Sequence, residues 1–184
     1  MLFATLATLL ATPALAPAAP PSGCIVMGMK AEGRKSPLDS LSFTVGTSDV
    51  KVCYGRPSAR GRAIFPGVVK FGQLWRFGAN EPTMIHTSGP LVIAGVKVGA
   101  GSYSLYAVPG DKEWEVIVNR SVKQWGEESG YTDEVKKQEV GRGKVKAEAA
   151  AAPVEQLTFS AAAKGAKELV VEWEKTKVRI PLGS

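Results

Sequence analysis

The chain has 184 residues, of which 45% are hydrophobic and 22% are charged. This length and balance fit one globular domain with a core of its own and exclude a wholly disordered chain. The net charge of +6 suits acidic or phosphate-bearing partners. Lys and Arg are spread along the chain, however, and no zinc-finger or RNA-binding motif occurs, so nucleic acid is not an expected partner.

The amino-terminal residues indicate a secretory signal peptide. Residues 2–12 are only Leu, Phe, Ala and Thr, a run too short to cross a bilayer, which takes about 20 apolar residues. Ala16-Pro17-Ala18 is a small-x-small cleavage signal, so we expect a signal peptide at 1–18 and no transmembrane segment after its removal. No Lys or Arg precedes the apolar run, which leaves open a start upstream of Met1. The expected location is the periplasm or the extracellular space.

Two cysteines, Cys24 and Cys53, remain after such a cut. An even number of cysteines in an exported chain favours a disulfide between them. The alternative is a lipid anchor on Cys24, because small residues precede it, although Pro21 stands where an apolar residue such as Leu is expected.

Residues 19–35 are expected to be a leader and the start of the folded body, and 36–184 a single β-rich domain. Leu41 to Val45 and Val50 to Tyr54 alternate apolar and polar residues around the turn residues 46–49, which predicts a hairpin. Further strands are expected at 83–87, 91–93, 96–98, 102–108, 114–118, 140–147 and 157–161, with a final hairpin formed by 169–173 and 178–182.

Tyr131 to Gln138 is the best helical candidate, with Thr132 as its cap, acidic residues in its first turn and lysines near its end. Glycine-rich turns every ten or so residues are typical of a β-sandwich or barrel. The predicted fold is therefore all-β, a mostly antiparallel β-sandwich or jelly-roll-like domain, with one short helix near 131–138.

Between the strands, residues 55–81 lose all periodicity, and long irregular stretches inside compact domains are often functional when ordered. Arg56, Arg60 and Arg62 place three guanidinium groups within seven residues, and such groups bind carboxylates and phosphates through paired hydrogen bonds. The alternative is structural, since arginines also pin loops by bonding backbone carbonyls and buried acids.

The second half of this stretch combines aromatic rings, a cation, an amide and a carboxylate in Trp75, Arg76, Asn80 and Glu81. A ligand site needs that mixture of a flat apolar wall and fixed polar groups. The competing hypothesis is an internal network in which Arg76 or Arg56 pairs with Glu81 while Asn80 satisfies a loop backbone.

His86 is the single histidine of the chain. It is a candidate general base or ligand contact, and a hydrogen-bonded structural histidine is the alternative. With one histidine and no C-x-x-C pair, a zinc site of the usual kinds is not available, and no P-loop, dinucleotide-binding or G-x-S-x-G motif occurs. We therefore expect no metal and no cofactor, and assign no catalytic residue.

The motifs of the chain together resemble the bacterial domain-of-unknown-function family 2911, a group of exported proteins. The segments that carry the resemblance are Y-G-R-P-S-A-R-G-R at 54–62, W-R-F-G-A-N-E-P-T at 75–83, G-S-Y-S-L-Y-A-V-P-G at 101–110, E-W-E-V-I-V-N at 113–119, Q-W-G at 124–126, P-V-E-Q-L-T-F at 153–159 and L-V-V-E-W-E-K-T-K-V-R-I-P at 169–181. The resemblance implies an exported, β-rich domain and no established activity. Family members commonly have Ala after the W-R-x-G-A-N-E motif, where this chain has Pro82.

Three functions are compatible with these observations. The first is an exported binding module for a small anionic or sugar-like ligand, with a site formed by Arg56, Arg60, Arg62, Trp75, Arg76, Asn80, Glu81 and His86. The second is a structural or protein-interaction domain in which those residues only lock the long loop. The third and least favoured is a hydrolase that uses Glu81 or His86. The oligomeric state is not predicted.

Overall fold

The computed structural model describes residues 23–28 and 30–184. The expected signal peptide at 1–18 and the first residues of the expected leader lie outside the described residues. Strands dominate the described chain: they are β1 (Leu38–Val45), β2 (Ser48–Gly55), β3 (Thr83–Thr87), β4 (Leu91–Ile93), β5 (Val96–Val98), β6 (Gly101–Val108), β7 (Glu113–Asn119), β8 (Glu139–Ser160) and β9 (Glu168–Gly183). The helical segments in this part are η1 (Ile64–Val68), η2 (Glu128–Gly130) and α1 (Asp133–Lys136).

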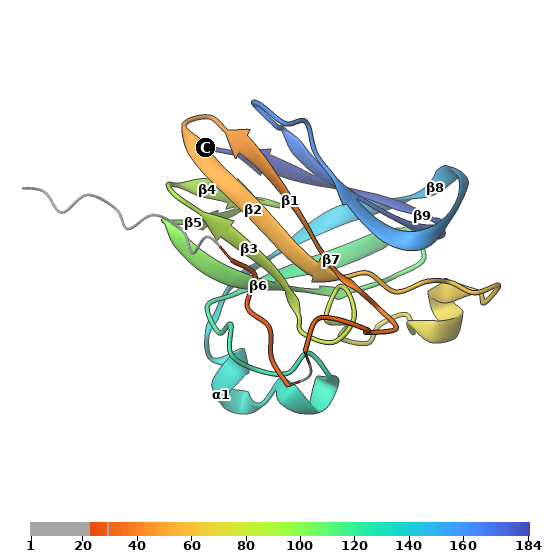
Figure 1. Ribbon diagram of the computed structural model, residues 1–184. Helices are drawn as coiled ribbons and strands as arrows, with labels where there is room; N and C mark the ends of the chain where they lie inside the picture. Colours follow the sequence, from red (N-terminus) through yellow and green to blue (C-terminus); the bar gives the residue numbers. More distant parts are fainter. Residues whose placement is uncertain (1–22, 29) are drawn as a thin grey trace, which may run out of the picture.

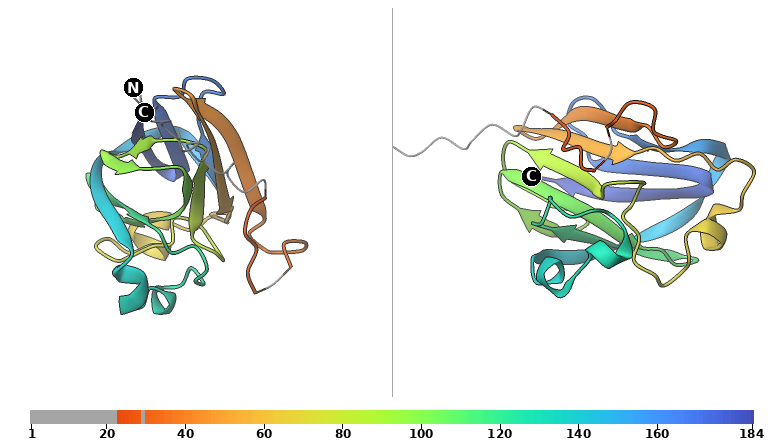
Figure 2. Two further views of the ribbon diagram at one scale, coloured as in Figure 1. Left: turned by 90° about the vertical axis from the view of Figure 1, so that its left-hand side faces the viewer. Right: turned by 60° about the horizontal axis from the view of Figure 1, so that its bottom comes forward.

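The strands form one antiparallel sheet in the order β1-β2-β3-β6-β7-β8-β9-β4-β5 (Figure 1). The sheet folds over on itself because β8, which has 22 residues, is shared between two layers. Its first part pairs with β7 and its second part with β9, and β9 in turn pairs with β4. The two views of Figure 2 show the resulting pair of layers around a common interior. The predicted all-β, antiparallel class is confirmed.

The main core fills the space between the layers. Each inward-facing strand contributes alternate apolar side chains, as a sheet with one buried face requires. On β2, for example, Val50, Val52 and Tyr54 are buried in this core. Leu105, Val116 and Ile180 reach it from β6, β7 and β9.

The first hairpin and the short helix are confirmed. β1 and β2 pair in register from Leu38 with Gly55 to Val45 with Ser48, as their alternation predicts. Helix α1 covers four residues, and the hydroxyl of Thr132 accepts a hydrogen bond from the N–H of Val135 at its amino-terminal end. That is the capping role expected of a threonine at this position.

The carboxyl-terminal strands differ from the prediction in two places. The strands expected at 140–147 and 157–161 belong to the single strand β8, and the expected hairpin of 169–173 and 178–182 is the single strand β9. The polar residues around Glu174 stay extended apart from a positive φ of 52° at Glu174 itself. The pairing register shifts between Ala149 and Val154, so the extra residues of β8 bulge opposite that point. A bulge therefore bends the strands where a turn was expected.

The outer face of the first layer carries a second buried patch. Cys53, Met84, Tyr106 and Ile117 alternate with the core residues of their strands and are buried without joining the main core. Buried Val135 of α1 lies in the segment 120–138, which packs over this face: Asn119 at the end of β7 donates a hydrogen bond of 2.7 Å to the carbonyl of Val135. The amino-terminal segment also reaches this face, because its Cys24 is bonded to Cys53 of β2.

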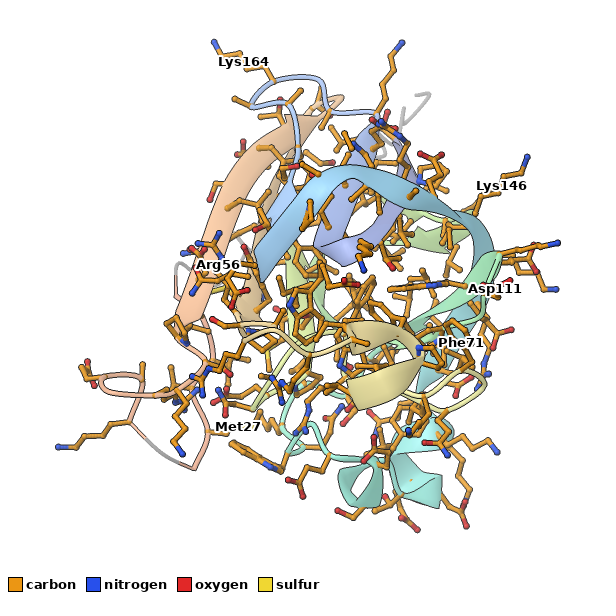
Figure 3. The ribbon with its side chains drawn as sticks, turned by 90° about the vertical axis from the view of Figure 1, so that its right-hand side faces the viewer. Met27, Arg56, Phe71, Asp111, Lys146 and Lys164 are labelled. Carbon is orange, nitrogen blue, oxygen red and sulfur yellow. A yellow bond between two sulfur atoms is a disulfide. The ribbon has the colours of Figure 1, made fainter. Side chains whose placement is uncertain are left out.

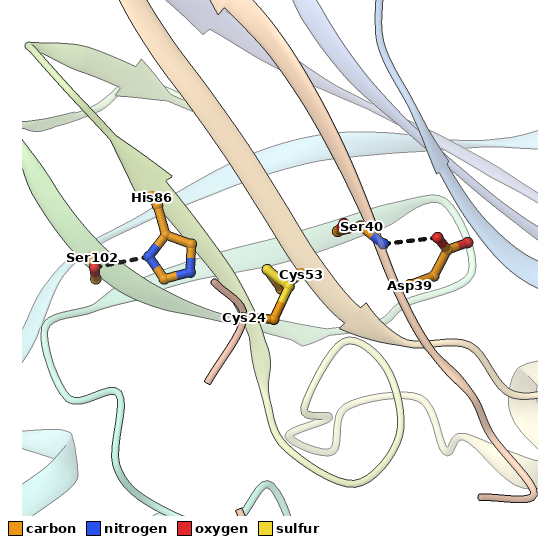
Figure 4. Close-up of a disulfide and its surroundings, with 6 residues drawn as sticks. All are labelled: Cys24, Asp39, Ser40, Cys53, His86 and Ser102. Carbon is orange, nitrogen blue, oxygen red and sulfur yellow. Dashed lines mark hydrogen bonds between the residues drawn. A yellow bond between two sulfur atoms is a disulfide. The ribbon is translucent and has the colours of Figure 1, made fainter. Parts of the chain in front are cut away.

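Cys24 and Cys53 form a disulfide, which confirms the predicted pair (Figure 4). The bond joins residues 29 positions apart and ties the amino-terminal segment to β2 at Cys24. The sulfur atom that a lipid anchor would need is thereby occupied. No helix among residues 23–28 and 30–184 is long and apolar enough to span a membrane.

Candidate functional site

The irregular stretch after β2 lies across one end of the folded sheet, which faces the viewer in Figure 3 with Phe71 beside η1. We call residues 62–71 the lid. Ile64 and Val69 of the lid point inward and are buried, whereas Val68 and Phe71 are 44% and 37% exposed. Gly61 and Gly72 flank the lid on either side, with φ values of 70° and 74° that glycine adopts without strain.

Beneath the lid lies a cluster of aromatic rings. Trp75 comes from the loop, Trp114 from β7 and Trp173 from β9, and all three indoles are at least nine-tenths buried. The rings of Trp75 and Trp173 are stacked, with centroids 5.9 Å apart and planes 19° apart. Trp114 meets Trp75 edge-on at 5.9 Å. Phe65 of the lid rests on the three tryptophans, at 4.9 Å from the Trp114 centroid.

A pocket of about 270 Å³ opens between the lid and this cluster. Trp75 and Trp173 form its aromatic wall. Its other side chains include the cations Arg62, Lys70 and Arg76, the amide Gln73 and the acid Glu128. Three cations against one acid favour an anion in the pocket, while the indole faces suit a flat or ring-shaped group.

The predicted site residues divide into two sets, and the first set lines this pocket. Arg62, Trp75 and Arg76 belong to it. The guanidinium of Arg62 donates to the carbonyls of Ala59 and Ser58, which holds it at the pocket edge. The indole N–H of Trp75 donates to the carbonyl of Gly78 over 3.1 Å and fixes the ring.

The second set is bonded into the fold. Arg56 donates to the carbonyl of Leu157 and to the hydroxyl of Thr158, and lies 3.4 Å from the carboxylate of Asp39. It thereby joins the end of β2 to β8. Arg60 is exposed, and its backbone N–H donates to the carboxylate of Glu155.

Glu81 is buried and pairs with Arg34, at 2.7 Å and 3.0 Å, instead of with Arg76 or Arg56. Its carboxylate also accepts the backbone N–H of Met27. Burial alone would raise the pKa of Glu81, but the hydrogen bonds from Arg34 and Met27 outweigh it and hold the pKa below its ordinary value. Asn80 donates to the carbonyl of Ser36, so this corner of the loop anchors the amino-terminal segment.

His86 lies on β3, away from the lid, and is fully buried (Figure 4). Its Nδ1 is 2.8 Å from the hydroxyl of Ser102, and its Nε2 has no hydrogen-bond partner in the described chain. Burial, assisted by the charge of Lys51, lowers the pKa of His86, so the ring is neutral at pH 7. The structure therefore does not bring His86 together with the pocket residues.

Lys70, Gln73 and Trp173 line the pocket but were not among the predicted site residues. Lys70 lies in the stretch V-V-K-F-G, whose apolar neighbours indicate a core instead of a site. Trp173 stands about 100 residues after Trp75 in the chain, and alternation along its strand marks it only as a core residue. Within residues 23–28 and 30–184, no three His, Cys, Asp or Glu side chains gather as metal ligands would.

Comparison with known proteins adds a family to this geometry. No curated protein and no solved structure matches the chain. A family model described as "Protein of unknown function (DUF2911)" matches residues 36–182, which takes in the lid, the pocket and the strands of the described chain except the last residue of β9. The chain therefore belongs to the DUF2911 family.

Proposed function

We propose that this protein is an exported binding domain that holds a small anionic or sugar-like ligand in the pocket between the lid and the tryptophans. One observation carries the proposal. Three cations from separate parts of the loop, Arg62, Lys70 and Arg76, line the same pocket as the stacked pair Trp75 and Trp173. Buried aromatic walls combined with a few fixed polar groups are typical of small-ligand sites.

The residues of the loop have two different roles, and this difference supports the proposal. Arg56, Asn80 and Glu81 are bonded to other parts of the fold, which keeps the ends of the loop in place. Lys70, in contrast, is exposed on the lid and none of the salt bridges of the described chain uses it. A loop whose ends are fixed and which holds an unpaired cation beside an aromatic wall is suited to bind an anionic group.

A protein-interaction role is the second candidate, and the exposed side chains of Val68 and Phe71 favour it. Val68 lines the pocket, Phe71 lines a neighbouring cavity beside Trp114, and neither belongs to the core. An apolar rim fits a protein partner as well as a ligand. The two functions differ in the size of what binds, so a screen of small molecules separates them.

The test is a thermal-shift screen of the full folded domain against inorganic anions, sugar phosphates and neutral sugars, because a ligand raises the melting temperature by mass action. Binding should weaken in Lys70→Ala. The control is Lys164→Ala, an exposed lysine far from the lid in Figure 3, which should bind as the wild type does. If no compound raises the melting temperature, or if both variants bind equally well, the pocket is not the site.

Export is the other part of the proposal. The apolar run at 2–12 and the disulfide between Cys24 and Cys53 support it, since disulfides persist mainly outside the cytoplasm. Expression with the native leader followed by intact-mass measurement tests it. The proposal predicts a mature chain that starts at Ala19 in the periplasm or medium and lacks two hydrogens. An uncleaved chain in the cytoplasm would contradict it, and an added acyl mass would indicate the lipid-anchored form.

A further inference from the structure

The tryptophan cluster holds a ring that belongs to the lid. Phe65 contacts Trp114 at 4.9 Å, Trp75 at 5.6 Å and Trp173 at 6.2 Å between centroids. We call these three indoles the tryptophan cup. Phe65 itself is only partly buried, unlike the rings of the cup. The cup thus accommodates a six-membered aromatic ring, and the ring now in it retains an edge toward solvent.

The cup also has hydrogen-bonding capacity that Phe65 leaves unused. The indole N–H groups of Trp114 and Trp173 are buried and have no hydrogen-bond partner in the described part of the chain. A buried polar group without a partner destabilises a fold by about 1–3 kcal/mol, so such groups usually mark a place for water or a ligand. A phenyl ring carries no oxygen or nitrogen that could accept these hydrogens. The carboxylate of an aromatic ligand could.

The lid is attached in a way that permits exchange of its ring. Within the described chain, the backbone hydrogen bonds donated by the lid stay within the irregular loop: the N–H of Arg62 donates to Ala59, that of Val68 to Ala63 and that of Val69 to Ile64. The next bond, from the N–H of Gly72, goes to the carbonyl of Pro109 in the turn after β6. The lid is therefore held by side-chain packing between two glycines with positive φ, and no strand pairing has to break for Phe65 to leave.

Two cavities adjoin the tryptophan cup, and their charges differ in sign. Phe65 lines the one beside Trp114 and contacts the rings of Trp75 and Trp173, which form the wall of the other. On the side of Trp173 the pocket contains Arg62, Lys70 and Arg76. On the side of Trp114 a second cavity, of about 200 Å³, contains the carboxylate of Asp111 and that of Glu148, which is also paired with Arg179 at the surface. An anionic group is attracted to the first side and repelled by the second, so these charges orient any ring that replaces Phe65.

From these observations we infer that the ligand of the pocket is a small aromatic carboxylic acid. Its ring replaces Phe65 in the tryptophan cup, and its carboxylate lies among the cations on the Trp173 side. This inference rests on the proposed function and adds the class of the ligand and the manner of its entry. Phe65 is then an internal competitor that closes the cup when no ligand is present.

The test follows tryptophan fluorescence of the folded domain during titration with phenylacetate. A Trp125→Phe background removes the indole that lies outside the cup, where it packs against Gly28. Phenylacetate should change the fluorescence, whereas acetate, which lacks the ring, and benzyl alcohol, which lacks the charge, should bind at least about tenfold more weakly. Glucuronate provides a non-aromatic ring with the same charge and should also bind more weakly.

Two variants of the lid distinguish displacement of Phe65 from binding elsewhere. Phe65→Ala should bind phenylacetate about tenfold more tightly, because the ligand no longer competes with an internal ring. Phe71 lines the second cavity, on the side away from the cations, and has no ring contact with the cup, so Phe71→Ala should change the affinity less than about twofold. Phe65→Leu, which keeps an apolar side chain, should also tighten binding and replaces Phe65→Ala if the latter does not fold.

Four results would overturn the inference, and they separate it from the proposed function. Equal affinity of the wild type and both Phe65 variants would exclude displacement. Tighter binding of glucuronate than of phenylacetate would exclude the aromatic class. Lys70-dependent binding of a sugar phosphate without any response to phenylacetate would leave the proposed function intact and refute the inference alone. The absence of binding by every compound would refute both.

Discussion

Arg34→Ala should be the most destabilising single substitution in the amino-terminal segment. The side chains of Arg34 and Glu81 are 2% and 4% exposed, and their charged groups are 2.7 Å apart. Removing the guanidinium leaves a carboxylate buried beside the N–H of Met27 with no counter-charge. Breaking a buried pair in this way costs about 3–5 kcal/mol, because the remaining charge has lost both water and its partner.

Arg179→Ala is the matched control. Arg179 pairs with Glu168 and Glu148 on the surface, where all three side chains are more than 40% exposed. Exposed pairs contribute about 0.2–1 kcal/mol, so the control should be several-fold milder than Arg34→Ala. For a domain of this size, 1 kcal/mol corresponds to roughly 2–4 °C in melting temperature, and the expected loss for Arg34→Ala is roughly 6–20 °C.

Urea titration followed by fluorescence, with the disulfide intact, measures both variants. Amide hydrogen exchange at Met27 provides a local measure, since that N–H loses its protection if the segment detaches from Glu81. Equal and small losses for the two arginine variants would refute the reasoning. They would mean that the buried pair contributes no more than a surface pair, and that Glu81 does not depend on Arg34 for its charge.

Three further predictions concern titration and the disulfide. The lowered pKa of His86 means that the folded protein binds this proton less readily than the unfolded chain, so the free energy of unfolding should fall as pH decreases below about 6.5. His86→Asn should remove that dependence, and urea titrations across pH would measure it. Because the pKa of Glu81 is lower in the folded protein than in the unfolded chain, its carboxylate should contribute stability that is complete above about pH 4.3 and is lost as pH falls through the pKa of the folded state. Glu81→Gln should therefore make the free energy of unfolding depend less on pH in the acidic range. Replacing Cys24 and Cys53 by Ala opens a loop with a separation of 29 residues. By the loop-entropy relation this should cost about 3.5 kcal/mol, and an unchanged unfolding midpoint would contradict that account.

Much of the fold could be predicted from local pattern. The alternation in β1 and β2 and the glycine-rich turns of the later strands indicate paired strands because each strand has one face on the core. The continuity of β8 could not be predicted in the same way. Its middle is the run Ala149 to Ala152, and alanine carries neither a strong β-propensity nor a pattern of polarity that marks a face.

Candidate site residues that lie in one segment of the chain could be predicted from the sequence, and those contributed by a distant segment could not. Arg62, Trp75 and Arg76 lie close together in one unusual stretch, so the sequence indicates them. Trp173 joins them only because β9 passes beneath the same loop in the folded protein. The partner of Glu81 was likewise assigned wrongly, since Arg34 lies 47 residues away and reaches it only when the disulfide and the loop bring the amino-terminal segment to the sheet. Local sequence patterns do not show which residues far apart in the chain come into contact.

The most direct test of the central claim is an NMR titration that follows the indole N–H signals of the four tryptophans. Addition of a ligand identified in the thermal-shift screen should move the signals of Trp75 and Trp173, which line the pocket. The signal of Trp125, which packs against Gly28 and does not line the pocket, should move much less. Movement of the Trp125 signal alone, or binding that leaves the pocket tryptophans unchanged, would contradict a ligand site beneath the lid.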